Sequence, residues 1–158
     1  MKSLLIWILF NGLAAMPAFA FEDKDLNGVW QYDGFFYEGH RYPNPNPNLE
    51  LYFTFNSVSH VDVLYYSRKN EVGFCERRAE FSVKGNSLHQ QITWINPANN
   101  AECQQDVDMQ IRRASETPFS FNVGELWFHL EVNGKPFTYI LKEKNGRQAH
   151  TQAVDGIL

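Results

Sequence analysis

Apolar and polar residues alternate along most of the chain from residue 29 onward. Alternation with a period of two, in segments rich in aromatic and β-branched residues, is typical of β-strands that bury one face. The pattern predicts about nine strands, at residues 29–37, 49–55, 61–66, 74–83, 88–95, 103–113, 119–121, 126–132 and 137–141. The alternation is clearest in 103–113, where Cys103, Val107 and Ile111 alternate with Gln104 and Asp108.

The segments between these strands carry turn and loop residues. Asn133 and Gly134 form a typical hairpin turn. Residues 42–48 (YPNPNPN) alternate proline with asparagine, which predicts a long exposed loop over 39–48 instead of regular pairing. No helical segment is long enough to connect parallel strands. We therefore predict an all-β protein, an antiparallel meander of 8–9 strands that closes into a barrel or folds as a sandwich.

The first twenty residues have the features of a signal peptide. Lys2 precedes the apolar run 4–10, Pro17 follows, and Ala18 and Ala20 supply the small residues of a cleavage site. An uncleaved membrane anchor is the alternative, but the apolar run is shorter than the roughly 20 residues that a bilayer crossing needs. We expect residues 1–20 to be cleaved, 21–144 to form one domain and 145–158 to be a polar tail. The product is then a soluble, monomeric, periplasmic or secreted protein without membrane insertion.

Charge and cysteine content narrow the possible partners. Removal of Lys2 leaves 13 basic and 18 acidic residues, a net charge of −5, which argues against nucleic acid or an anionic membrane as partner. Cys75 and Cys103 are the two cysteines. An isolated pair in an exported protein usually forms a disulfide. No C-x-x-C motif or adjacent histidine points to a metal or redox site, so we predict the bond Cys75–Cys103.

The segment Leu26–Trp30 (LNGVW) has the L-x-G-x-W form that opens the first strand of lipocalin-like proteins. The segments L-x-L-x-F-x-F (49–55), VKGNSL (83–88) and 124–142 follow in the same order as in that group. Over residues 26–144 the chain resembles small bacterial lipocalin-like proteins of the calycin type. The resemblance implies a closed barrel, with Gly28 and Trp30 as structural residues. It also implies that Trp30 crosses the closed end beneath a basic residue of the last strand, for which Lys142 and Lys144 are available.

Eight aromatic residues are candidates for the barrel interior. An eight-stranded barrel is just wide enough to be filled by side chains or to hold one small ligand, and we expect a mostly filled interior with a shallow pocket at the mouth. The favoured function is an exported, non-enzymatic binding protein that holds a small apolar ligand in the barrel or at its mouth. The candidate ligand-binding residues are Tyr32, Phe36, Phe53, Phe55, Trp94, Phe121, Phe128 and Tyr139.

The alternative is a protein-binding module, such as an inhibitor of an enzyme that attacks the cell envelope. Loops on a rigid scaffold commonly carry function, and the candidate recognition surface on the proline–asparagine loop comprises Tyr37, His40, Tyr42, Pro43 and Asn44. An enzyme is disfavoured because no catalytic motif is present. No catalytic residue, metal ligand or cofactor is predicted.

Two further groups of polar residues are candidates for chemical sites. Asp106 and Asp108, expected on one strand face near Glu102, are better explained as a solvated surface than as a calcium or acid–base site. The sequence places His40 in the proline loop and His60, His89 and His129 in predicted strands, without the spacing of metal ligands. We expect His129 to face solvent.

Overall fold

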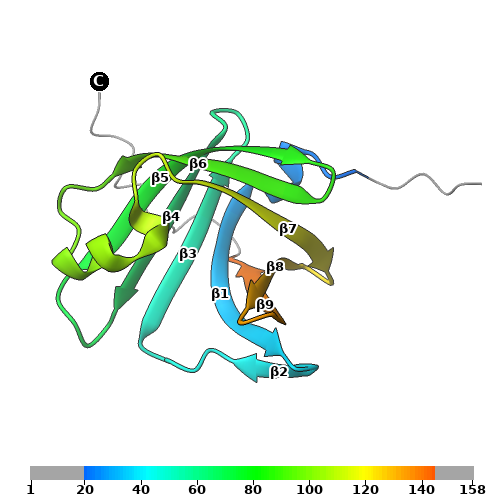
Figure 1. The fold of residues 1–158 in the computed structure, drawn as a ribbon, viewed down its shortest axis with the longest axis horizontal. Coiled ribbons are helices and arrows are strands. Elements are labelled where there is room, and N and C mark those ends of the chain that lie inside the picture. Colours follow the sequence, from blue (N-terminus) through cyan, green and yellow to red (C-terminus); the bar gives the residue numbers. More distant parts are fainter. Residues whose placement is uncertain (1–19, 145–158) are drawn as a thin grey trace, which may run out of the picture.

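The computed structural model describes residues 20–144, which form one antiparallel sheet of nine strands. The sheet closes on itself because β1 pairs with β9, so eight strands make a barrel and β2 adds to β1 (Figure 1). The strands are β1 Gly28–Tyr37, β2 His40–Pro43, β3 Leu49–Asn56, β4 Val61–Arg68, β5 Phe74–Lys84, β6 Ser87–Ile95, β7 Ala114–Asn122, β8 Glu125–Val132 and β9 Lys135–Glu143. Three short 3-10 helices are η1 Asp23–Leu26, η2 Ala101–Gln105 and η3 Val107–Met109.

These strands confirm the predicted all-β meander. The pairing of β1 with β9 shows that the meander forms a barrel and not a sandwich. Eight of the nine predicted strands match β1 and β3–β9. On β5, for example, buried Cys75, Ala79 and Phe81 alternate with the outward-facing Glu76 and Glu80, as period-two burial requires. The predicted leader and tail lie outside the described residues, except for Ala20.

The predicted strand at 103–113 is wrong, because this segment forms η2 and η3. Burial recurs every three residues: Cys103 and Met109 are buried, and Asp106 between them is half-buried. That spacing fits the three residues per turn of a 3-10 helix. Val107, which the alternation placed on the same face as Cys103, is 51% exposed. Asp106 and Asp108 therefore do not share a strand face; the Asp106 side chain accepts a hydrogen bond from the Asp108 backbone N–H at 2.8 Å.

The proline–asparagine loop is shorter than predicted. His40–Pro43 form β2, which pairs with the end of β1 from Gly34 to Tyr37. Proline is tolerated in an edge strand, where its missing N–H removes no ladder bond. Residues 44–48 form the actual loop, shaped by asparagine side chains: the Asn44 Oδ1 accepts from the Asn46 backbone N–H at 3.0 Å. His60 lies in the β3–β4 turn, not in a strand.

Gly34 lets β1 and β2 approach closely. A Cβ at this position would lie 2.2 Å from the backbone oxygen of Tyr42, which cannot move away without breaking the pairing. We expect Gly34→Ala to lower the free energy of unfolding by about 3 kcal/mol, the upper range for overpacking. Gly39→Ala, in the turn beside it, has open space around the added methyl and should cost only about 1 kcal/mol for its positive φ. Equal losses in chemical denaturation would contradict this account.

One end of the barrel is closed by η1 and the core beneath it. The Trp30 ring is buried among Leu26, Phe55 and Leu126, and its Nε1–H donates to the Leu26 carbonyl at 2.8 Å. Gly28 begins β1 with a φ of +136°, a conformation that other residues rarely adopt. Trp30 thus lies at the closed end, as the resemblance implies.

The basic residue implied above Trp30 has a different position. Lys142 pairs with Asp33 at 3.0 Å, and the Lys144 ammonium lies 4.6 Å from the centre of the Tyr52 ring. Both lysines are exposed. The tryptophan is held instead by its hydrogen bond to η1 and by apolar packing, so the implied basic cover is wrong for this chain.

Candidate binding site at the open end of the barrel

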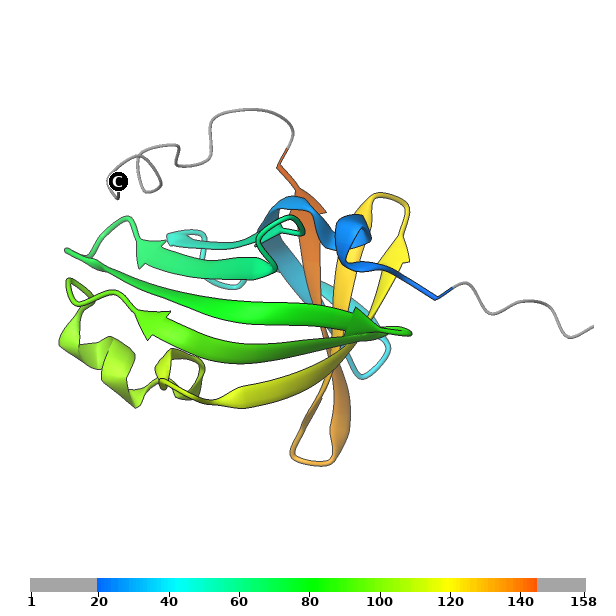
Figure 2. The same ribbon diagram turned by 90° about the horizontal axis from the view of Figure 1, so that it is seen from above.

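The end of the barrel opposite η1 carries the features that suggest binding. The β3–β4, β5–β6 and β7–β8 turns lie at the closed end, whereas the β1–β2, β4–β5 and β8–β9 turns lie at the other, with η2 and η3. Figure 2 shows the β8–β9 turn projecting beyond the neighbouring strands. We call this end the open end.

Six aromatic rings form a continuous series on the inner face at the open end. Phe35 stacks on Tyr42 and Phe137 at centroid distances of 5.1 and 4.9 Å. Phe137 contacts Tyr139 at 5.1 Å, and Tyr139 contacts Tyr32 at 5.4 Å. Together with Tyr37, at 6.2 Å from Phe137, these rings form what we call the aromatic wall: Tyr32, Phe35, Tyr37, Tyr42, Phe137 and Tyr139.

A β-bulge in β1 builds this wall. The register between β1 and β9 shifts between Tyr32 and Gly34, which inserts one residue and reverses the alternation beyond it. Phe35 therefore lies opposite Tyr139, on the face that carries the buried Leu141. Phe35 and Phe137 were not among the predicted ligand-binding residues. The alternation of Phe137 with Tyr139 and Leu141 in the sequence would have indicated Phe137, whereas a bulge leaves no such signal.

The aromatic wall is apolar and uncharged, and part of it is open to solvent. Tyr42 is 41% exposed and Tyr139 37% exposed. Burial raises the pKa of Tyr32 to about 12. Burial also raises the pKa of Tyr139, and the negative charge of Asp106 adds to that effect. These phenols therefore stay neutral at physiological pH and can donate hydrogen bonds.

Asp106 and Tyr66 form the other side of the open end. The Tyr66 hydroxyl donates to the Asp106 carboxylate at 2.8 Å, and this bond and burial raise the pKa of Tyr66. Cys103 and Met109 pack beneath η2 and η3 against Leu64. The disulfide Cys75–Cys103 ties η2 to β5, which confirms the predicted bond.

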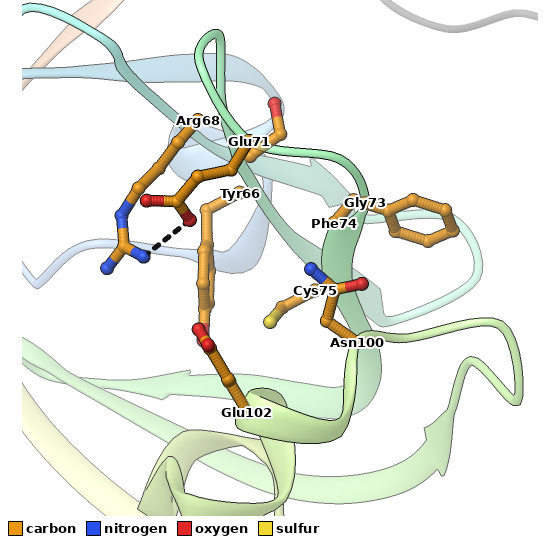
Figure 3. A pocket seen from close by; sticks show the side chains of 9 residues that line it. Tyr66, Arg68, Glu71, Gly73, Phe74, Cys75, Asn100 and Glu102 are labelled. Carbon is orange, nitrogen blue, oxygen red and sulfur yellow. Dashed lines mark hydrogen bonds and ion pairs between the residues drawn. The ribbon is translucent and has the colours of Figure 1, made fainter.

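A polar pocket of about 210 Å³ lies between the β4–β5 turn and η2 (Figure 3). Arg68 pairs with Glu71 at 2.9 Å on one side, and the Asn100 side chain donates to the Val72 carbonyl at 2.9 Å on the other. None of the eight predicted aromatic residues lines it. The lining residues are Tyr66, Ser67, Arg68, Glu71, Gly73, Phe74, Cys75, Asn100 and Glu102.

Six of the eight predicted ligand-binding aromatics face the interior. Tyr32 and Tyr139 belong to the aromatic wall. The other four fill the core towards the closed end through ring contacts, such as Phe53 with Phe128 at 5.4 Å and Trp30 with Phe121 at 5.8 Å. These four are Phe53, Phe55, Phe121 and Phe128. Of the eight predicted ligand-binding aromatics, the structure therefore brings Tyr32 and Tyr139 together in the aromatic wall.

Phe36 and Trp94 lie on the outer face, so their placement inside the barrel is wrong. Phe36 contacts Trp127 at 5.2 Å, and Trp94 lies under the Arg78 guanidinium at 4.6 Å. Each follows a bulge, one at Tyr32/Gly34 and one at Arg78/Ala79, where strict alternation fails.

The five residues of the predicted recognition surface lie in three places: the aromatic wall, the exposed part of β2 and the loop that follows it. Tyr37 and Tyr42 belong to the aromatic wall. His40 and Pro43 are exposed on β2, and Asn44 begins the loop with its amide donating to the Leu49 carbonyl at 3.3 Å. Asn44 therefore shapes the loop as well as lying at the surface.

The remaining polar candidates have structural partners. His129 lies on the outer face between the hydroxyls of Ser120 and Thr138, at 2.9 and 3.2 Å, instead of facing solvent freely, and burial lowers its pKa. Across residues 20–144, no group of three histidine, cysteine, aspartate or glutamate side chains is placed to bind a metal ion. Within that same range, no helix has the length and apolar character needed to cross a membrane.

A closed antiparallel barrel of eight strands, with one end capped by a tryptophan and a short helix, defines a lipocalin-like barrel. A solved structure of a lipocalin-like protein from Bacteroides uniformis matches it with a TM-score of 0.50. The match covers 76% of this chain and 99% of the other, at 16% identity, and shows the shared fold alone. No protein-family model matches the sequence, and no curated protein matches it significantly.

Proposed function

We propose that this protein is an exported, non-enzymatic binding protein that holds a small apolar ligand at the open end, against the aromatic wall. The observation that carries the proposal is the continuous series of six rings, two of which expose more than a third of their surface. Ligand sites are lined mainly by apolar and aromatic side chains, and the mouth of a β-barrel is one of the places where they occur.

The packing of the barrel favours the mouth over the interior as the ligand site. The core near the closed end is filled by ring contacts among Trp30, Phe55 and Phe121. The other half is occupied by Leu64, Cys103 and Met109. A ligand that covers Tyr42 and Tyr139 would remove their apolar surface from water without displacing this core.

Two features support export. Residues 1–20 have the pattern of a signal peptide, and the disulfide Cys75–Cys103 indicates an oxidising compartment. Edman sequencing of the protein secreted by an exporting bacterial host should give Phe21 as the first residue. An intact Met1 would contradict the proposal.

An uncharged apolar probe tests the ligand site. We expect N-phenyl-1-naphthylamine to bind with increased fluorescence, and the double variant Tyr42→Ser, Tyr139→Ser to weaken binding at least about tenfold, because two large apolar contacts are lost. Tyr52→Ser is the matched control, since Tyr52 lies on the outer face beside Tyr65. Absence of probe binding, or equal losses in both variants, would contradict an aromatic binding site.

The protein-binding alternative is favoured by one observation. β2 is the terminal strand of the sheet, and all four of its residues are exposed, so a partner could reach both its edge and Tyr42. If the intact chain inhibits lysozyme, that result would support this alternative over a small-ligand carrier. Replacement of His40–Asn44 should then abolish the inhibition, whereas the control Tyr52→Ser should leave it unchanged.

A further inference from the structure

The open end holds a carboxylate, that of Asp106, as well as the uncharged rings of the aromatic wall. Tyr66, on the inner face of β4, holds Asp106 through a 2.8 Å hydrogen bond, and the Asp108 backbone N–H donates to the other carboxylate oxygen at 2.8 Å. Both carboxylate oxygens are therefore fixed by short bonds. The side chain is half-buried, so one side remains accessible.

The aromatic wall lies across the barrel from this carboxylate. Tyr66 pairs with Leu51 of β3, β3 pairs with β1, and β1 carries Tyr32 in contact with Tyr139 of β9. Four adjacent strands thus present Tyr66, Leu51, Tyr32 and Tyr139 around one opening. The effect of the Asp106 charge on Tyr139 agrees with this arrangement.

The charges around the opening favour a positively charged ligand. Three basic side chains at this end are paired with carboxylates: Arg68 with Glu71, Arg113 with Asp108, and Lys135 with Glu38. The bonds that Asp106 accepts come from the neutral Tyr66 hydroxyl and a backbone N–H. The two groups that hold the Asp106 carboxylate are therefore uncharged and do not neutralise it.

The aromatic wall already contacts an ammonium group. The Lys135 Nζ lies 5.8 Å from the centre of the Tyr37 ring. A cation over the face of a tyrosine is attracted by the negative electrostatic potential of the ring. The same interaction is open to a ligand cation at Tyr139, whose pKa is raised by burial and further by the negative charge of Asp106.

We infer that the ligand held at the open end is an organic amine, with its apolar body on the aromatic wall and its ammonium group between Asp106 and the tyrosine rings. This inference rests on the proposed function and specifies the ligand class for the same site. It assigns Asp106 as the residue that distinguishes cations from neutral molecules, and Tyr66 as the residue that positions it.

Three compounds with the same apolar body test the inference: 2-phenylethylamine, 2-phenylethanol and phenylacetate. By calorimetric titration of the intact chain, we expect the amine to bind about tenfold more tightly than the alcohol, from combined ion-pair and cation–π attraction, and phenylacetate to bind most weakly. Asp106→Asn should remove the preference for the amine and leave binding of the alcohol unchanged, since the amide keeps the shape of the side chain: its Oδ1 can accept from the Asp108 backbone N–H, and its Nδ2–H can donate to the Tyr66 hydroxyl oxygen.

Controls separate this inference from the proposed function and from misfolding. Glu102→Gln removes an exposed carboxylate of η2 and should keep the preference for the amine, because the Tyr66 hydroxyl donates to Asp106. Tyr66→Phe should reduce that preference. Equal affinities for amine and alcohol, or an Asp106→Asn variant that still prefers the amine, would overturn the inference while the aromatic site stands. If none of the compounds and no neutral probe binds, the proposed function itself fails.

Discussion

Replacing Arg77 with methionine is expected to lower the free energy of unfolding by about 3 to 5 kcal/mol, because it leaves a buried carboxylate without its cation. Asp62 is fully buried and Arg77 is 4% exposed. The guanidinium bonds directly to one oxygen of Asp62, and the Gln90 amide donates to the other at 2.9 Å. This ion pair lies inside the barrel, where water cannot replace a lost partner.

The loss of unfolding free energy in Arg77→Met should grow as the pH rises. Burial is the largest influence on Asp62 and raises its pKa, while Arg77 lowers it, so removal of Arg77 raises the pKa further. An acid with a higher pKa in the folded state binds more protons when folded, and stability then falls as the pH rises. The deficit of Arg77→Met should be smallest below about pH 4, near the pKa of unfolded aspartate, and grow towards neutral pH.

A double variant provides the control. Asp62→Leu together with Arg77→Met removes both charges and should be close to the natural protein in stability, as apolar replacements of buried pairs often are. Urea denaturation at pH 4 and pH 7 measures all three proteins. A single variant within 1 kcal/mol of the natural protein, or a deficit that shrinks as the pH rises, would contradict a buried ion pair at this position.

The strand pattern of this barrel could be predicted from its sequence, whereas its bulges could not. Alternation located eight strands because each barrel strand buries one face, as the burial of Cys75, Ala79 and Phe81 on β5 shows. A bulge adds one residue and changes which face every later residue occupies. Phe36 and Trp94 were placed inside for this reason, and both lie outside.

The two sides of the candidate site differ in how far the sequence indicated them. The sequence indicates four of the six rings of the aromatic wall, but it assigns them to two separate surfaces: Tyr32 and Tyr139 to the barrel interior, and Tyr37 and Tyr42 to the loop. Asp106 was assigned to a solvated strand. The spacing of Cys103, Asp106 and Met109 satisfies a three-residue repeat, and neighbouring apolar residues happen to give a two-residue alternation as well. The choice between a strand and 3-10 helices depends on contacts with distant segments, here the disulfide of Cys103 to β5 and its packing against Leu64.

The disulfide Cys75–Cys103 holds η2 against β5. We expect its removal to lower the free energy of unfolding by a similarly large amount. Cys75 and Cys103 are 28 residues apart, and a loop of this length gives about 3 to 4 kcal/mol of stabilisation by restricting the unfolded chain. We expect the double variant Cys75→Ala, Cys103→Ala to lose that amount of unfolding free energy. Both sulfurs are buried beside Leu64 and Met109, so packing losses would add to it.

Hydrogen exchange shows whether the disulfide stabilises η2 and η3 locally or the whole barrel equally. In hydrogen–deuterium exchange, amides of residues 101–109 should exchange much faster in the double variant than in the natural protein. Amides of β8 and β9, which pair along their whole length, should change only in step with global stability. The same segment carries Asp106, so the variant should also lose its preference for 2-phenylethylamine over 2-phenylethanol while still binding N-phenyl-1-naphthylamine. Uniform exchange across the barrel, or an unchanged amine preference, would show that η2 and η3 hold their position without the disulfide.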